Sequence, residues 1–211
     1  MSRVTWKENT VISIETRKGV FVLAQMLISP YLMIYNIFRN DNDWAGLKLD
    51  NTQTLFCKPV TRQFLKKSNI TKQPNIPPCS NLDIPRYWIK FPPGNRKVKV
   101  WENTEYEREF ITLAESPNAS LIEDDITVGG IKDVQIVMPS IPLDDMGTFD
   151  AYETTSVSIY PELNERLYLC YMLGKNIDPA KYISAGKELP LECDKYVDII
   201  AGKVSLSELG Y

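Results

Sequence analysis

One stretch of 20 residues, from Gly19 to Phe38, carries no charge and is flanked by a basic residue on each side. Its length would suit a transmembrane helix. Ser29-Pro30 interrupts its middle, however, and the stretch is rich in β-branched and aromatic residues, which favour strands. We therefore expect two successive buried strands, at residues 20–28 and 31–38, rather than a membrane span.

The surrounding segments also read as β-structure. Residues 11–16 alternate between apolar and polar side chains, and further short strands are expected at residues 47–49 and 55–60. Residues 68–95 contain six prolines and should run as an extended, ordered connection over the first sheet or between domains. The first 67 residues therefore predict a meander of antiparallel hairpins.

Strands continue into the second half of the chain and then give way to helices. The expected strands lie at residues 97–101, 109–113, 126–128 and 134–138, with Gly129-Gly130 as a turn and residues 148–158 as an ambiguous further strand. Helix signals follow, with starts at Pro161, Asp178-Pro179 and Leu191, stops at Gly174, Gly186 and Gly202, and a capping box from Ser205 to Glu208.

This order predicts an α+β fold, with an antiparallel, strongly bent sheet or partial barrel in the first two-thirds and short helices at the C-terminus. Two regions are expected along the chain. Residues 1–95 form a β-rich unit with the proline-rich connection, and residues 96–211 form an acidic α+β region. Whether the two pack as one domain stays open from the sequence.

The sequence has no histidine among its 211 residues. Its absence excludes Ser-His-Asp and Cys-His nucleophile pairs, histidine general bases and histidine-ligated zinc. Phosphate-binding glycine motifs are also absent, and the four cysteines form no CxxC pair. We expect a protein that is not an enzyme and that uses no cofactor and no metal, although carboxylate-based hydrolysis stays an alternative.

The net charge of −3 conceals two opposed halves. Residues 1–100 carry 16 Lys and Arg against 6 Asp and Glu, whereas residues 101–211 carry 8 against 21. Within residues 102–165, 15 acidic residues face only Arg108 and Lys132. Such asymmetry calls for internal neutralisation or for a partner of opposite charge.

Two acidic clusters are the candidate partner-binding residues, and they comprise Glu123, Asp124, Asp125, Asp144, Asp145 and Asp150. Neither cluster has the alternating register of a calcium loop, which argues against a metal. Solvated acidic loops are the alternative interpretation. The basic residues of the first half are scattered singly, so direct binding to nucleic acid is not expected.

The first eight residues lack the apolar core of a secretory signal, so we expect a cytoplasmic protein with reduced, partly buried thiols. No membrane association is expected.

The first 95 residues contain a recognisable order of features. These are Trp6, the strand at residues 10–14, the segments 19–25 and 30–38, Leu55-Phe56 with Val60, Gln73-Pro74-Asn75, and Ile84-Pro85-Arg86-Tyr87. In this order they resemble the immunity protein 26 family. The resemblance implies a cytoplasmic antidote of bacterial polymorphic toxin or contact-dependent inhibition systems, which binds a cognate toxin domain, often a nuclease, and blocks it. It covers somewhat under half of the chain and carries no catalytic residues.

The sequence thus leads to one main hypothesis and one alternative. The main hypothesis is an immunity protein that neutralises the C-terminal domain of a cognate toxin, a basic nuclease, through the acidic stretch. The alternative is a small β-barrel binding module that takes a nucleic acid or a small ligand through the basic first half.

Overall fold

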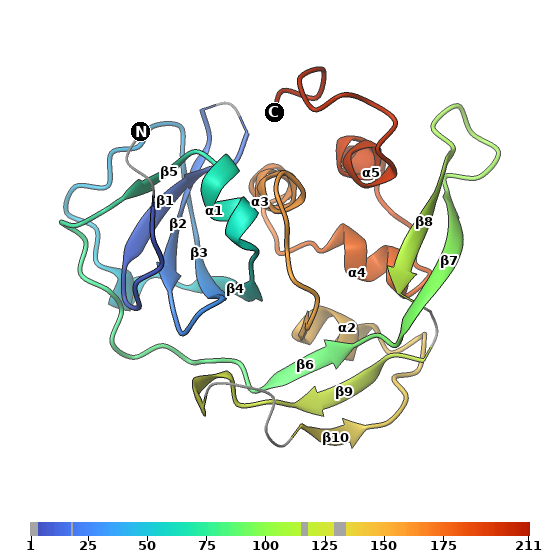
Figure 1. The fold of residues 1–211 in the computed structure, drawn as a ribbon, viewed down its shortest axis with the longest axis horizontal. Coiled ribbons are helices and arrows are strands. Elements are labelled where there is room, and N and C mark those ends of the chain that lie inside the picture. Colours follow the sequence, from blue (N-terminus) through green and yellow to red (C-terminus); the bar gives the residue numbers. More distant parts are fainter. Residues whose placement is uncertain (1–3, 18, 115–117, 129–133) are drawn as a thin grey trace. The chain divides into compact units, whose positions relative to one another are not determined.

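The fold is described from a computed structural model, which describes residues 4–17, 19–114, 118–128 and 134–211 (Figure 1). The chain divides into two compact units. Unit 1 comprises Met1–Ile84, Val157–Asn176 and Gly210–Tyr211, and unit 2 comprises Pro85–Ser156 and Ile177–Leu209. From the sequence we expected two regions, residues 1–95 and 96–211. That division of the chain stays a prediction.

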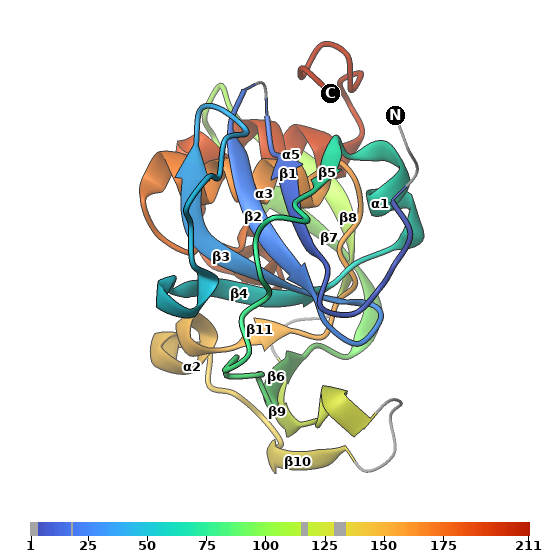
Figure 2. The same cartoon turned by 90° about the vertical axis from the view of Figure 1, so that its left-hand side faces the viewer.

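Unit 1 is built on a five-stranded antiparallel sheet with the order β4-β3-β2-β1-β5 (Figure 2). Its elements are β1 (Val11–Glu15), β2 (Phe21–Met26), β3 (Tyr31–Arg39), η1 (Leu49–Asn51), β4 (Thr54–Pro59), α1 (Arg62–Lys67), β5 (Ile70–Lys72) and α3 (Glu162–Leu173). Register shifts in the β2–β3 and β3–β4 pairs mark bulges, which bend strands and increase their twist. The sheet stays open, with β4 and β5 at its edges.

The uncharged stretch forms β2 and β3, as the sequence predicted, and the chain turns between them at Ser29-Pro30. The turn is closed by the amide of Tyr31, which donates to the carbonyl of Ile28 at 2.9 Å. Nearly all residues of β2 are buried, because both faces of the sheet are covered. In the described part of the chain, no helix is long and apolar enough to cross a membrane.

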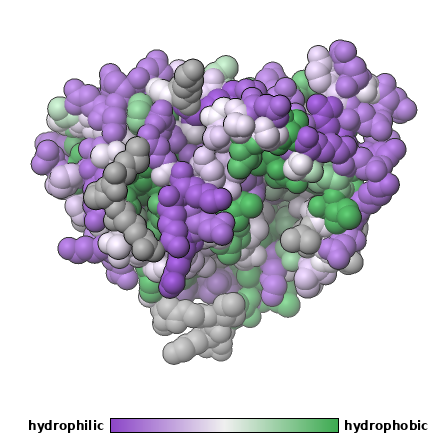
Figure 3. Space-filling model, turned by 45° about the horizontal axis from the view of Figure 1, so that its top comes forward, coloured by the Kyte–Doolittle hydropathy of each residue, from purple (hydrophilic) through white to green (hydrophobic). Residues whose placement is uncertain are grey.

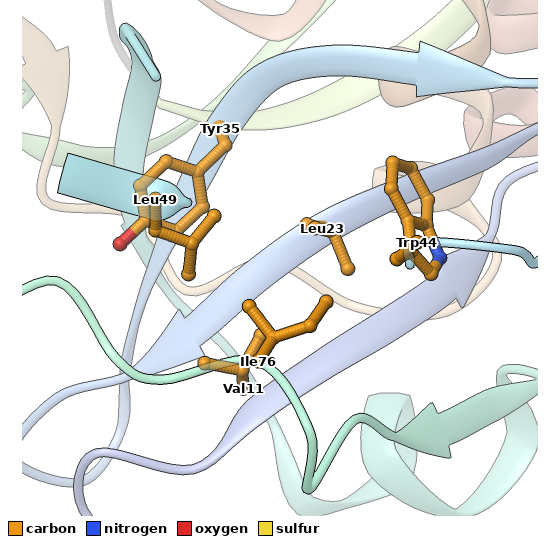
Figure 4. Close-up of a cluster of buried hydrophobic side chains, with 6 residues drawn as sticks. All are labelled: Val11, Leu23, Tyr35, Trp44, Leu49 and Ile76. Carbon is orange, nitrogen blue, oxygen red and sulfur yellow. The ribbon is translucent and has the colours of Figure 1, made fainter. Parts of the chain in front are cut away.

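One face of this sheet carries a cluster of buried side chains (Figure 4). Val11, Leu23 and Tyr35 come from three adjacent strands, and connecting segments supply Trp44, Leu49 and Ile76. Cys79 and Leu82 pack against the same cluster, so the proline-rich connection does run over the first sheet. Leu49 belongs to η1, and the strand expected at residues 47–49 is therefore wrong. The burial of Leu49 in a short 3-10 turn explains the apolar pattern there.

Helices α1 and α3 lie together on the other side of the sheet (Figure 1). Asn164 of α3 donates to the carbonyl of Glu15 at 2.8 Å, and the guanidinium of Arg166 lies over the ring of Phe56, 3.8 Å from its centre. Helix α3 ends at Gly174, whose φ of 64° suits glycine. Leu163, Leu167 and Cys170 are buried as predicted from the helical spacing, whereas Met172 is exposed.

Unit 2 combines a four-stranded sheet, a hairpin and three short helices among its described residues. The sheet has the order β10-β9-β6-β11, with β6 (Tyr87–Lys90), β9 (Ser120–Glu123), β10 (Gln135–Met138) and β11 (Glu153–Thr154). The pair β11–β6 is parallel, and the other two pairs are antiparallel. The hairpin is β7 (Pro93–Val100) with β8 (Arg108–Ala114), and the helices are α2 (Met146–Ala151), α4 (Pro179–Ser184) and α5 (Asp194–Ala201).

A small core joins helix α2 to the sheet of unit 2. Phe149 of α2 is buried with Ile89 and Leu121, and its ring stacks on Phe91 at 6.4 Å between ring centres. The hairpin makes its own contact with α4, in which Arg96 donates to the carbonyl of Ile183 at 2.8 Å. Arg108 of β8 adds an ion pair to Asp198 of α5 at 2.7 Å.

Two expectations for unit 2 need correction. Residues 126–128 form a 3-10 turn, η2 (Ile126–Val128), rather than a strand, because Asp125 caps the turn. The ambiguous segment 148–158 contains the end of α2 and only the two-residue strand β11. The expected turn at Gly129-Gly130 lies outside the described residues.

The predicted α+β class is confirmed, with a bent, open sheet that is largely antiparallel and short helices late in the chain. The helix starts at Pro161 and Asp178-Pro179 and the stops at Gly174, Gly186 and Gly202 are also confirmed. Asp178 caps α4, with Pro179 as its first residue, and Gly202 ends α5 with a φ of 63°. The chain from Leu191 to the start of α5 is a 3-10 turn, η3 (Leu191–Cys193), before the helix proper.

Candidate functional site

The opposed charges of the sequence also separate by unit. Unit 1 contains 13 Lys and Arg against 8 Asp and Glu, a balance of +5. Unit 2 contains 11 against 19, a balance of −8. All six predicted partner-binding residues belong to unit 2. The acidic field expected from the sequence is therefore a property of one compact unit.

The first predicted cluster lies where β9 ends. Glu123 is the last residue of β9 and forms an ion pair with Arg86 at 3.0 Å. Asp125 accepts from the hydroxyl and the amide of Thr127, at 2.6 and 3.0 Å, and these bonds lower the pKa of its carboxyl group. Asp124 takes part through its backbone, and no described residue bonds its side chain. Of the three, Asp124 alone has a carboxylate that makes no bond within the described ranges of the chain.

The second cluster surrounds α2. Asp145 caps this helix by accepting from the hydroxyl and the amide of Thr148, at 2.6 and 3.0 Å, which lowers the pKa of its carboxyl group. Asp150 accepts from the hydroxyl of Tyr182 at 3.0 Å. Burial, together with this bond, raises the pKa of Tyr182 to about 12. Asp144 is exposed, and no described residue bonds its side chain.

The two clusters do not form a single site. Ile141, just before the second cluster, donates to the carbonyl of Ala119 at the beginning of β9, at 2.7 Å. The first cluster follows Glu123 at the other end of β9. A four-residue strand spans roughly 13 Å, so the clusters flank β9 rather than converge. They define an acidic surface with two separate parts.

A third acidic segment, residues 101–107, lies almost entirely within the predicted acidic stretch 102–165, although it contains none of the six predicted partner-binding residues. It connects β7 to β8 and carries Glu102 and Glu105, both exposed and without a bonding partner among the described residues. Trp101 fixes the segment by donating from Nε1 to the carbonyl of Leu189 at 2.8 Å. Glu107 accepts from the amide of Asn103 at 2.9 Å. The sequence does indicate a turn here, because Thr104 lies among polar residues between two predicted strands.

Apolar side chains also reach the surface of unit 2. Ile136 and Val137 of β10 are 66% and 51% exposed, and Ile111 of β8 is 68% exposed. Figure 3 shows one face of the molecule, on which hydrophilic side chains predominate and apolar ones gather in smaller patches. Exposed apolar side chains among acidic ones are typical of protein-binding surfaces.

Unit 1 contains a polar network beneath the proline-rich connection. The side-chain oxygen of Gln25 accepts from the hydroxyl of Tyr35 and from the amide of Cys79, both at 2.8 Å. Burial, with a bond to Asp50, raises the pKa of the Cys79 thiol, and burial likewise raises the pKa of Tyr35. A protonated thiol is a poor nucleophile, so a reactive Cys79 is not indicated. The bond from the Cys79 amide to Gln25 instead holds the proline-rich connection on the sheet.

The chemistry available for metals is limited. All four cysteines are free, and three of them are buried. Among the residues that the structure describes, no three His, Cys, Asp or Glu side chains come together as a metal site.

The geometry therefore defines a mixed α+β protein with an acidic surface on one unit. By sequence, the chain belongs to the family described as Domain of unknown function (DUF8309), which matches residues 1–185. The match covers unit 1 almost completely and reaches the end of α4 in unit 2. Neither the curated proteins nor the solved structures contain a match to the chain.

Proposed function

We propose that this chain is a cytoplasmic immunity protein that binds the C-terminal domain of a cognate toxin, a basic nuclease, and neutralises it. The observation that carries the proposal is the separation of charge, with a balance of −8 on unit 2. The resemblance of the first 95 residues to the immunity protein 26 family supports the same function. On this proposal the chain itself performs no catalysis and binds no nucleic acid directly.

The physical argument follows from what a nuclease must do. A nuclease holds a polyanion and presents basic groups, so an acidic inhibitor is steered towards it and excludes the substrate. The carboxylates of Asp124 and Asp144 are the members of the predicted set that no described residue bonds. Because Asp125 and Asp145 cap local turns, they contribute charge at fixed positions.

The direct test mixes the purified chain with the toxin domain encoded immediately upstream. We expect a complex of one copy of each protein and loss of nuclease activity at an equal molar ratio. Full nuclease activity in the presence of excess chain, with no complex on size exclusion, would contradict the proposal.

A charge-reversal variant tests the contact surface. Glu123, Asp124 and Asp125 are changed together to Lys, which we expect to slow association at least tenfold and to flatten its dependence on salt. The matched control makes the same change of charge on unit 1, at the exposed residues Glu8, Asp41 and Asp83. If the control slows association as much as the test variant, the assignment of the contact surface to residues 123–125 is wrong.

A nucleic-acid or small-ligand module on unit 1 is the alternative, and the balance of +5 on that unit favours it. Its strands form an open sheet rather than a closed barrel. Retention of the full chain on an RNA or DNA column, lost with increasing salt, would favour this alternative. Passage through the column at low salt would favour the toxin-binding proposal.

A further inference from the structure

Strand β10 forms an exposed edge of the sheet in unit 2. Within the described part of the chain it has a neighbour on one side only, β9. The four residues of β10 are Gln-Ile-Val-Met, and none of them is charged. Unpaired backbone groups along such an edge can bond to another strand. The exposed side chains of Ile136 and Val137 lie along this edge.

The other edge strands of the two larger sheets are protected among the described residues. Strand β5 is short and carries exposed Thr71 and Lys72, and β11 has only two residues, both buried. Strand β4 is mostly buried, and Val60 just after it bridges to Ser158. Lysines, short length and burial are the usual ways of blocking an edge. Strand β10 has no charged residue and no buried side chain, so its edge is not blocked in either of these ways.

The hairpin of unit 2 offers a useful contrast. Lys97 pairs with Glu109 at 2.7 Å, and Lys99 lies 3.8 Å from the same carboxylate. Charged side chains thus cover the solvent side of β7 and β8 around the exposed Ile111. The apolar side chains of β10 have no such cover within their own strand.

The charges beside β10 indicate what fits there. In the antiparallel register Gln135 lies opposite Glu123, so Glu123, Asp124 and Asp125 stand at the Gln135 end of the edge. Arg86 neutralises only Glu123 directly. An added strand therefore gains most if it is apolar along β10 and basic at the Gln135 end. A second copy of this chain fits poorly, because it brings another unit with a balance of −8.

We infer that β10 is a docking edge that takes an extended, basic and apolar segment of a protein partner as an additional strand. The inference rests on the proposed function, in which the toxin domain supplies this segment. Backbone groups of β10 that face away from β9 bond to the segment and fix it in place. The apolar contacts and the acidic end select its sequence.

The first experiment uses a blocked ten-residue peptide of alternating Lys and Val as the probe. We expect its addition to the full chain to shift the amide resonances of residues 135–138 and to slow their hydrogen exchange. A peptide with Glu in place of Lys should bind at least tenfold more weakly. If the basic peptide leaves the amides of β10 unchanged, or binds elsewhere, the inference is overturned.

The second experiment compares two variants of the full chain. Ile136→Lys with Val137→Lys should weaken binding of the basic peptide and of the toxin domain at least tenfold, because Lys blocks an edge and repels a basic segment. Ile111→Lys is the matched control, since Ile111 is equally exposed in the same unit, and it should change binding less than twofold.

The outcomes separate this inference from the proposed function. If the toxin domain binds both variants like the unsubstituted chain, the docking edge is wrong and the function stands. If the peptide binds at β10 but the toxin domain does not bind at all, the function is wrong and the edge stands. Conversion of a dimer to a monomer by the double substitution would show that the occupant is a second copy, which also overturns the inference.

Discussion

Unit 1 buries the carboxylate of one ion pair completely, whereas the hairpin of unit 2 carries ion pairs on an exposed face. Both carboxylate oxygens of Glu165 are occupied by Arg17, Tyr211 also donates to this carboxylate, and the Glu165 side chain is fully buried. Arg17 also lies over the ring of Tyr168, 3.9 Å from its centre. In unit 2, Lys97 and Glu109 pair on an open hairpin face. Charge therefore contributes to the fold of both units, through Arg17 and Glu165 in unit 1 and through Arg108 and Asp198 in unit 2.

The central strands of the unit 1 sheet also differ from the strands of the four-stranded sheet in unit 2, whose separate hairpin has longer strands of eight and seven residues. The strand β3 runs for nine residues, and β2 beside it is almost entirely buried. Strands β6, β9 and β10 have four residues each, and β10 is exposed along one edge. Long buried strands resist distortion, whereas an exposed strand with an unpaired edge can accept a further strand. The contrast suits a rigid support in unit 1 and a contact surface in unit 2.

The largest expected effect concerns the core of unit 1. Leu23→Ala removes a fully buried side chain from the cluster with Tyr35 and Trp44, and should lower the free energy of unfolding by about 3 kcal/mol. Urea unfolding, followed by hydrogen exchange in each unit, measures the change. Met172→Ala, at an exposed position of the same unit, should change it by less than about 0.5 kcal/mol. Equal effects of the two substitutions would contradict the assigned core.

The second prediction compares the ion pairs of the two units. Arg17→Met leaves Glu165 buried without its cation and should cost about 2 kcal/mol, below the usual range for a buried pair because Arg17 is partly exposed. Arg108→Met breaks the more exposed pair with Asp198 and should cost about 1 kcal/mol or less. Thermal unfolding of both variants gives the comparison, and the reverse order would refute the contrast between the units.

The third prediction, with a smaller expected effect, tests whether Asp145 holds α2 by capping it or by its charge. Asp145→Ala removes the acceptor for the amide of Thr148, so hydrogen exchange within α2 should speed up. Asp145→Ser removes the same charge but keeps a capping oxygen, so exchange should stay close to that of the unsubstituted chain. Faster exchange in both variants would mean that charge, rather than capping, holds α2.

The smallest expected effect depends on pH. The pKa of Tyr182 is raised to about 12 in the folded chain, above the value of about 10 for an unfolded one. A raised pKa stabilises the fold below pH 10, and this stabilisation is lost as the pH rises towards 12. Tyr182→Phe should therefore make the stability of unit 2 less dependent on pH in this window. An unchanged slope would remove Tyr182 as the cause.

The sequence predicted strands β1 to β4, β7, β8 and β10 and the C-terminal helices α3, α4 and α5. Strands β1, β2 and β3 followed from apolar runs, and α3 and α4 followed from proline starts and glycine stops. Strand β9 was missed, because its four residues become a strand only by pairing with β6 and β10 on either side. Helix α1 was also missed, although Thr61 caps it and Lys66 and Lys67 close it.

The sequence predicted the negative charge of the candidate site, but not which of its carboxylates are bonded locally. Counting charges placed the acidic field in the second half of the chain, and the structure gives unit 2 a balance of −8. The sequence could not separate capping carboxylates from free ones by charge alone. The Asp145–Thr148 spacing was a usable capping signal. The exposure of β10 depends on the order of strands, which no local pattern encodes.

The most direct test of the central claim is the association rate of the full chain with the toxin domain as a function of salt, with hydrogen exchange measured in the complex. We predict that the rate falls steeply as salt increases and that protection appears in unit 2, including residues 135–138. A rate independent of salt, with protection confined to unit 1, would contradict the claim that the acidic unit makes the contact.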